Sequence, residues 1–130
     1  MTTLRWILAL IAASFAGLQY NDPDPLVWVG LYGAAALALA LAALGRPVSA
    51  LAWCVVGAGL VLVAISLPGL CQYLANSDGV TVSDAMSSRY PYIEATRELG
   101  GAAVAIVMAL LAVGKGRPRQ NSRQTPSAGL

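Results

Sequence analysis

Four long apolar stretches, separated by short polar ones, dominate the pattern of hydrophobic and polar positions along the chain. None of them contains a charged residue, and they cover residues 6–20, 26–44, 48–74 and 99–114. A helix rises about 1.5 Å per residue, and the hydrocarbon core of a bilayer is about 30 Å thick. The second and third stretches are long enough to cross it. The first and fourth reach only about 24 Å, so the charged residues at their ends must enter the membrane boundary.

The composition places the chain in the same class. It has 130 residues, of which 58% are hydrophobic and 11% are charged, and its mean hydropathy is +0.68. A soluble domain usually carries about 25% charged residues. We therefore predict an all-α membrane protein, a bundle of four transmembrane helices that forms a single domain over residues 1–114. The predicted spans are about 4–20, 25–44, 48–74 and 92–114.

The first apolar stretch also has features of a cleaved signal peptide. Arg5 would be its basic region, and Ser14-Phe15-Ala16 would be its cleavage site. Cleavage would leave three spans and would separate the polar stretch 19–25 from the helix before it. We therefore favour four spans.

Lysine and arginine residues gather on one side of this four-span arrangement. The positive-inside rule makes that side, which includes both termini, cytoplasmic. It holds Arg5, Arg46, Lys115, Arg117, Arg119 and Arg123, whereas Arg89 and Arg97 fall on the other, outer side. All six acidic residues fall on the outer side: Asp22, Asp24, Asp78, Asp84, Glu94 and Glu98. We predict a multi-pass integral membrane protein, of the inner membrane if the source is bacterial, with a basic, disordered cytoplasmic tail at 115–130 that attracts anionic lipid.

The chain offers little for redox, metal or nucleophilic chemistry. It has no histidine, which is the commonest transition-metal ligand and general base. Cys54 and Cys71 fall in one span about 25 Å apart, too far for a disulfide, and we expect them to be buried apolar residues. We therefore expect no resident cofactor, and we favour a protein without enzyme activity. We also expect no nucleic-acid partner.

Small residues recur every four positions in three of the spans, a spacing that lets helices approach closely in lipid. We expect them to pack against neighbouring helices. They are Gly30, Ala34, Ala38 and Ala42 in the second span, Gly101 and Ala105 in the fourth, and Ala13 and Gly17 in the first. Trp28 is expected at the outer membrane interface, as part of an aromatic belt. Pro68 predicts a kink in the third span.

The short stretch 19–25, with the sequence QYNDPDP, joins the first two spans. An acidic residue followed by proline is a good helix start, because the acid occupies the N-cap and the proline the first turn. One such pair accounts for a turn and a cap. Two pairs, together with Gln19 and Asn21, exceed what a turn requires.

A second polar motif, Glu94-Ala-Thr-Arg97-Glu98-Leu-Gly-Gly101, opens the fourth span. Glu94 and Glu98 lie one helical turn apart on one face. A charge costs about 2.5–3.5 kcal/mol at the bilayer centre and less at the boundary, so we expect these charges to pair and to face the bundle interior. We predict that Arg97 bridges Asp22 or Asp24.

The two motifs together predict a polar pocket at the outer face, with Ser66 and Gln72 as further lining residues. The alternative is a charge cluster that only pins the helices together. The residues predicted to form this ligand-binding or structural cluster are Gln19, Asn21, Asp22, Asp24, Glu94, Arg97 and Glu98.

The same two motifs carry a resemblance. The pattern Gln19-x-Asn21-Asp22-Pro23-Asp24, followed by Trp28 and Tyr32 and then by Glu94-x-x-Arg97-Glu98-Leu99-x-Gly101, resembles the transmembrane protein 220 family over roughly 16–113. The resemblance implies a small multi-span membrane protein, and it implies no particular activity. It makes Asn21, Asp22, Asp24, Arg97 and Glu98 the defining polar positions. Relatives can carry a further apolar C-terminal stretch, where this chain has its basic tail.

The function that these observations favour is non-enzymatic. The protein would be an accessory subunit of a larger membrane complex, a homo-oligomer, or a binder of a small ligand at the outer face. A divalent cation would bind the oxygens of Asp22, Asp24, Glu94 and Glu98. A lipid headgroup would place its phosphate at Arg97 and its amine at the acids. The alternatives are a membrane enzyme that uses a carboxylate pair as acid and base, acting on lipid, and an oligomeric transporter or channel subunit.

Overall fold

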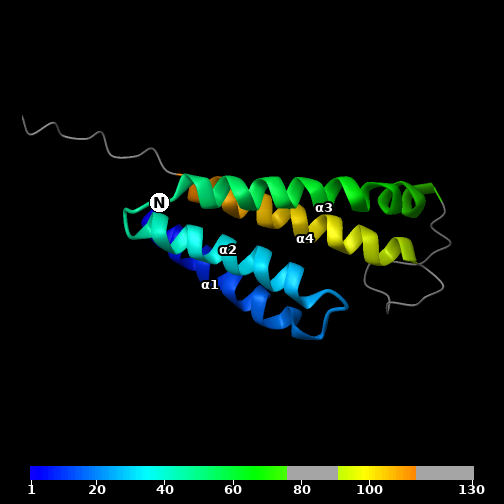
Figure 1. Cartoon of the computed structure of the whole chain (residues 1–130), viewed down its shortest axis with the longest axis horizontal. Coiled ribbons are helices and arrows are strands. Elements are labelled where there is room, and N and C mark those ends of the chain that lie inside the picture. Colours follow the sequence, from blue (N-terminus) through cyan, green and yellow to red (C-terminus); the bar gives the residue numbers. More distant parts are fainter. Residues whose placement is uncertain (76–90, 114–130) are drawn as a thin grey trace, which may run out of the picture.

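Four α-helices make up most of the computed structural model, which describes residues 1–75 and 91–113 (Figure 1). The helices are α1 (Thr2–Leu18), α2 (Pro25–Ala43), α3 (Ser49–Ala75) and α4 (Pro91–Ala112), and a single 3₁₀ turn, η1 (Gln19–Asn21), follows α1. Each helix begins and ends within two residues of its predicted span. No strand occurs in the described ranges. The prediction of an all-α bundle is confirmed, because all four helices are long and apolar enough to cross a membrane.

The predicted basic, disordered tail at 115–130 lies outside the described ranges. The helix α3 continues through Pro68 to Ala75. Cys54 and Cys71 are free thiols on the exposed surface of α3, so the prediction that they are buried is wrong.

The helices form two antiparallel hairpins, α1 with α2 and α3 with α4 (Figure 1). The helix α2 also packs against both α3 and α4, whereas α1 touches α4 only lightly and does not contact α3. The link between the hairpins begins with a Schellman motif, in which Gly45 has a φ of 75°. The Gly45 N–H donates to the Ala42 carbonyl, and the Arg46 N–H donates to the Leu41 carbonyl. Glycine is favoured here because this conformation is costly for other residues.

Two buried clusters form the core along the bundle. One lies around Trp28 and Tyr32, and the other lies around Leu39, nearer the chain's N-terminus. The predicted packing of small residues is confirmed for Ala38, Ala42 and Ala105, which are buried.

The prediction for α1 is wrong, because Ala13 and Gly17 are both exposed. The helix instead packs through Ala9, Ala12 and Ala16, which share another face at the helical spacing of three and four residues.

The two hairpins diverge toward the turn that joins α1 to α2, and they meet at the opposite end (Figure 1). The diverging end carries Asp22, Asp24, Glu94 and Glu98, and we call it the acidic end. The opposite end carries Arg5 and Arg46, and we call it the basic end. Within the described ranges, charges of opposite sign are therefore separated along the bundle, apart from Arg97.

A hydrogen bond at the basic end ties the first helix to the last. The Nε of Arg5 donates to the carbonyl of Leu111 at 3.0 Å. The last carbonyls of a helix have no partner within that helix, and a cation is stabilising there. Arg5 therefore caps α4 from α1, which has few other contacts with α4.

We predict that Arg5→Gln lowers the free energy of unfolding by about 1–2 kcal/mol, because a charge-assisted hydrogen bond is lost. The matched control is Arg46→Gln, because Arg46 is exposed at the same end. Detergent-induced unfolding followed by circular dichroism measures both. Equal losses in the two variants would contradict the capping role.

Candidate functional site

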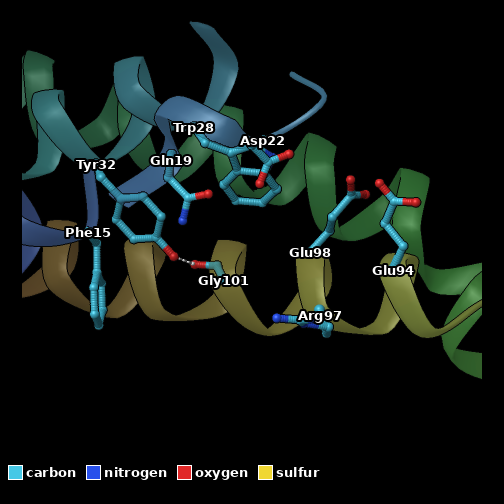
Figure 2. A pocket seen from close by; sticks show the side chains of 9 residues that line it. All are labelled: Phe15, Gln19, Asp22, Trp28, Tyr32, Glu94, Arg97, Glu98 and Gly101. Carbon is cyan, nitrogen blue, oxygen red and sulfur yellow. Dashed lines mark hydrogen bonds between the residues drawn. The ribbon is translucent and has the colours of Figure 1, made fainter. Parts of the chain in front are cut away.

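A pocket of about 280 Å³ lies between the two diverging hairpins at the acidic end (Figure 2). Side chains from α1, α2, α4 and the turn after α1 surround it. The lining residues are Phe15, Gln19, Asp22, Trp28, Tyr32, Glu94, Arg97, Glu98 and Gly101.

The carboxyl groups reach the pocket from both hairpins. Glu94 and Glu98 project from one face of α4 toward the α1–α2 turn (Figure 2), as their spacing of one helical turn requires. Asp22 faces them from the turn itself. Its Oδ1 accepts a hydrogen bond from the Asp24 backbone N–H at 3.5 Å, an arrangement typical of an Asx turn. Each carboxylate is therefore placed by local backbone structure.

Glu98 is half-buried and has a contact on α3. The Oγ of Ser66, which is 2% exposed, donates to Glu98 Oε2 at 3.4 Å. The bond is long, so it holds the carboxyl only weakly. Ser66 was expected near the pocket, and the structure places it beside Glu98. Gln72, expected with it, is exposed and does not line the pocket.

Two of the predicted cluster residues lie outside the pocket. Asn21 and Asp24 are exposed and are not among its lining. Asp24 is the N-cap of α2 and Pro25 its first residue, although the Asp24 side chain makes no capping hydrogen bond. The Asp24–Pro25 pair therefore starts the helix, and Asp22 is the acid that faces the cavity.

The predicted bridge between Arg97 and Asp22 or Asp24 is wrong. Arg97 is exposed, and no ion pair joins it to either residue among those described. Figure 2 shows it leaving α4 on another side from the two glutamates. The reason is helical geometry, because position 97 is rotated by about 60° from position 94 and by about 100° from position 98. Arg97 still borders the cavity.

Aromatic side chains close the floor of the pocket. The rings of Trp28 and Tyr32 stack at 6.1 Å with an interplanar angle of 28°, and Phe15 meets Tyr32 edge-on at 5.5 Å. Tyr32 Oη donates to the Gly101 carbonyl at 3.0 Å, which satisfies a buried hydroxyl. Trp28 is 5% exposed and packs inside the bundle, so its ring is not part of an exposed aromatic belt.

Gly101 lets the floor form. A Cβ at this position would lie 3.0 Å from Tyr32 Oη and 3.3 Å from Trp28 Cζ3, both tighter than ordinary contacts. The absent side chain allows α2 to approach α4 closely. The interpretation of the sequence missed the floor. The sequence pattern that could have predicted it is an aromatic pair four residues apart on α2, together with a glycine on α4.

The charges in the pocket do not balance. Three carboxyl groups line it, and Arg97 turns away from them. Residues 1–75 and 91–113 hold no group of three or more His, Cys, Asp or Glu side chains arranged to hold a metal ion. The geometry therefore offers carboxylates spread around a cavity rather than a compact coordination cage.

A second hollow lies between α2 and α3 and has a volume of about 430 Å³. Its lining is almost wholly apolar and contains no charged residue: Val27, Gly30, Leu31, Ala34, Leu51, Cys54, Val55, Ala58, Val61 and Leu62. An apolar groove on a membrane helix suits lipid tails and carries no recognition chemistry. The acidic-end pocket is therefore the candidate functional site.

Fold and site together define a small four-span helical membrane protein with a mixed-charge pocket at one end. The chain matches the family described as "Transmembrane family 220, helix" over residues 11–114, and it belongs to that family. The matched range includes every residue of the pocket. No curated protein and no solved structure matches the chain.

We predict that Gly101→Ala destabilises the protein by about 1–3 kcal/mol relative to Gly100→Ala, because the added methyl group crowds Tyr32 and Trp28. Gly100 is the matched control, since an added Cβ there would meet nothing within 4 Å. Both substitutions bring the same gain in helix propensity. Detergent-induced unfolding measures the difference. Equal stability of the two variants would show that the α2–α4 contact is looser than described.

Proposed function

We propose that this protein binds a small organic cation, an ammonium group, in the pocket at the acidic end. The observation that carries the proposal is the position of Glu98. It lies inside a membrane-spanning segment, Ile93–Ala112, faces a cavity, and has one long hydrogen bond from Ser66 as its described partner. Charged groups at such depth are costly and are usually paired.

The surroundings of Glu98 favour a positive ligand. Glu94 and Asp22 share the cavity, so the local charge is negative and a cation entering it is attracted. The aromatic floor excludes water on one side, which strengthens this attraction. A bound cation would supply the compensation that Arg97 does not.

The chemistry of the site favours an ammonium over a metal ion. A divalent metal requires several oxygen ligands converging at short distance, and the described residues hold no such group. An ammonium donates separate hydrogen bonds in different directions, and spread carboxylates accept these well. A cavity of about 280 Å³ has room for a small group of this kind. The distribution of lysine and arginine predicts that this end faces the non-cytosolic side.

The test uses Trp28, whose ring lines the pocket. Trp6 and Trp53 are exposed, so a Trp6→Phe, Trp53→Phe background leaves Trp28 as the reporter. Ethylammonium chloride is titrated into the protein in an uncharged detergent, with sodium chloride at equal ionic strength as reference. We predict a saturable fluorescence change. Glu98→Gln is expected to weaken binding about tenfold, because one charge-assisted hydrogen bond is lost.

The matched control is Asp24→Asn, which removes a carboxylate at the same end but outside the pocket. It is expected to leave the dissociation constant unchanged. The proposal fails if sodium and ethylammonium give the same response. It also fails if Asp24→Asn and Glu98→Gln weaken binding equally, because a general surface charge would then explain the result.

A further inference from the structure

Among residues 1–75 and 91–113, the lining of the candidate pocket is exposed on the side between α1 and α4. Near the basic end, Ala12 of α1 lies in one buried cluster with Met108 of α4. Toward the acidic end, α1 contributes only the partly buried Ala16 to the core, and the hairpins diverge (Figure 1). Phe15, which is 36% exposed, and Arg97 line the pocket and are also exposed. In the described part of the chain, the exposed side of the pocket is therefore the one between α1 and α4.

The pocket lies at the acidic end of the candidate membrane span of α4, next to the position expected for lipid headgroups. The membrane-spanning segment of α4 starts at Ile93, and Glu98 follows five residues later, about 7.5 Å along the helix axis. The charged part of the cavity thus occupies the first turns of the span. Headgroups lie just outside this layer of a bilayer, so a headgroup amine has to enter the pocket to reach the carboxylates.

The charges are ordered from the inside of the pocket to its rim. Glu98 and Glu94 point inward, and Arg97 leaves α4 on another side (Figure 2). Val104 is exposed and lies seven residues after Arg97, which puts it on nearly the same face of α4, about 10 Å along the helix axis. The order is therefore carboxylate, guanidinium and apolar surface. A phospholipid with an amine headgroup has the matching order of ammonium, phosphate and acyl chains.

We infer that the bound cation is the primary ammonium of a zwitterionic phospholipid, which enters between α1 and α4 with its amine foremost. The inference rests on the proposed function, and it adds the source of the ammonium and its route. The phosphate lies at Arg97, and the acyl chains remain in the bilayer.

The burial of the Trp28 and Tyr32 rings favours a primary amine over a trimethylated amine as the ligand. A trimethylammonium group has no N–H to donate and is recognised by open aromatic faces. Here Trp28 and Tyr32 are 5% and 4% exposed, and their rings pack on each other. The carboxylates remain as the recognition groups, and they require N–H donors.

The test is a competition between lipids for the full chain. Purified protein is equilibrated with equal amounts of phosphatidylethanolamine, phosphatidylcholine and phosphatidylglycerol that have identical acyl chains. Native mass spectrometry then counts the retained lipids. We expect phosphatidylethanolamine to exceed phosphatidylcholine about tenfold, as one extra charge-assisted hydrogen bond implies. Glu98→Gln should abolish this preference. Arg97→Gln should reduce retention of phosphatidylethanolamine and phosphatidylcholine alike.

The control variants distinguish failure of the lipid inference from failure of the proposed ammonium site. Asp24→Asn should retain the wild-type preference, and Glu94→Gln serves as the second pocket variant where Glu98→Gln does not fold by circular dichroism. Equal retention of phosphatidylethanolamine and phosphatidylcholine by the wild-type protein overturns the lipid inference, as does a preference that survives the pocket variants. If ethylammonium still binds in that case, the proposed ammonium site stands. If neither ethylammonium nor the lipid binds, both fall.

Discussion

A carboxylate that enters the boundary of a bilayer requires a partner, and this constraint organises the acidic end of the molecule. The charge-free part of α4 is too short to span the hydrocarbon, so Glu98 is drawn into the membrane-spanning segment. Among the described residues, the Ser66 hydroxyl donates a hydrogen bond to it at 3.4 Å. The other carboxylates of the pocket add to the same negative charge. The proposed ammonium ligand would balance this charge.

The fold creates the space for such a ligand by holding the hairpins together at one end only. Close approach of α2 to α4 depends on the missing side chain of Gly101, and the Tyr32 hydrogen bond marks where it stops. Beyond that point the hairpins separate, and the turn after α1 brings Asp22 over the gap. At the opposite end, Arg5 joins α1 to α4. The pocket therefore lies where the two hairpins are separated, and the buried core lies where they are in contact.

The sequence predicted the helices well because their limits follow from local chemistry. Charges end the apolar stretches, Gly45 ends α2, and Asp24 with Pro25 begins it. The sequence also identified most of the polar residues that line the pocket, because charged side chains near a membrane span usually face the interior of the bundle.

The rest depended on how the helices are rotated and where they diverge. The spacing of Arg97 and Glu98 gives the angle between them, but which of the two faces the other hairpin is decided by packing elsewhere. Trp28 was assigned to the interface because tryptophan is common there, yet the small neighbour at Gly101 makes a buried position available. No local sequence pattern predicts that the hairpins diverge, because their divergence arises from contacts between α1, α2 and α4.

The most direct test of the account asks whether position 98 is reached by water from the non-cytosolic side. In a Cys54→Ser, Cys71→Ser background, Glu98→Cys is exposed to a membrane-impermeant, cationic methanethiosulfonate reagent on sealed, oriented vesicles, with Arg46→Cys as the opposite marker. The account predicts that the thiol at 98 reacts from the non-cytosolic side and that the thiol at 46 reacts only from the cytosolic side. A thiol at 98 that stays unreactive from the non-cytosolic side would contradict the account.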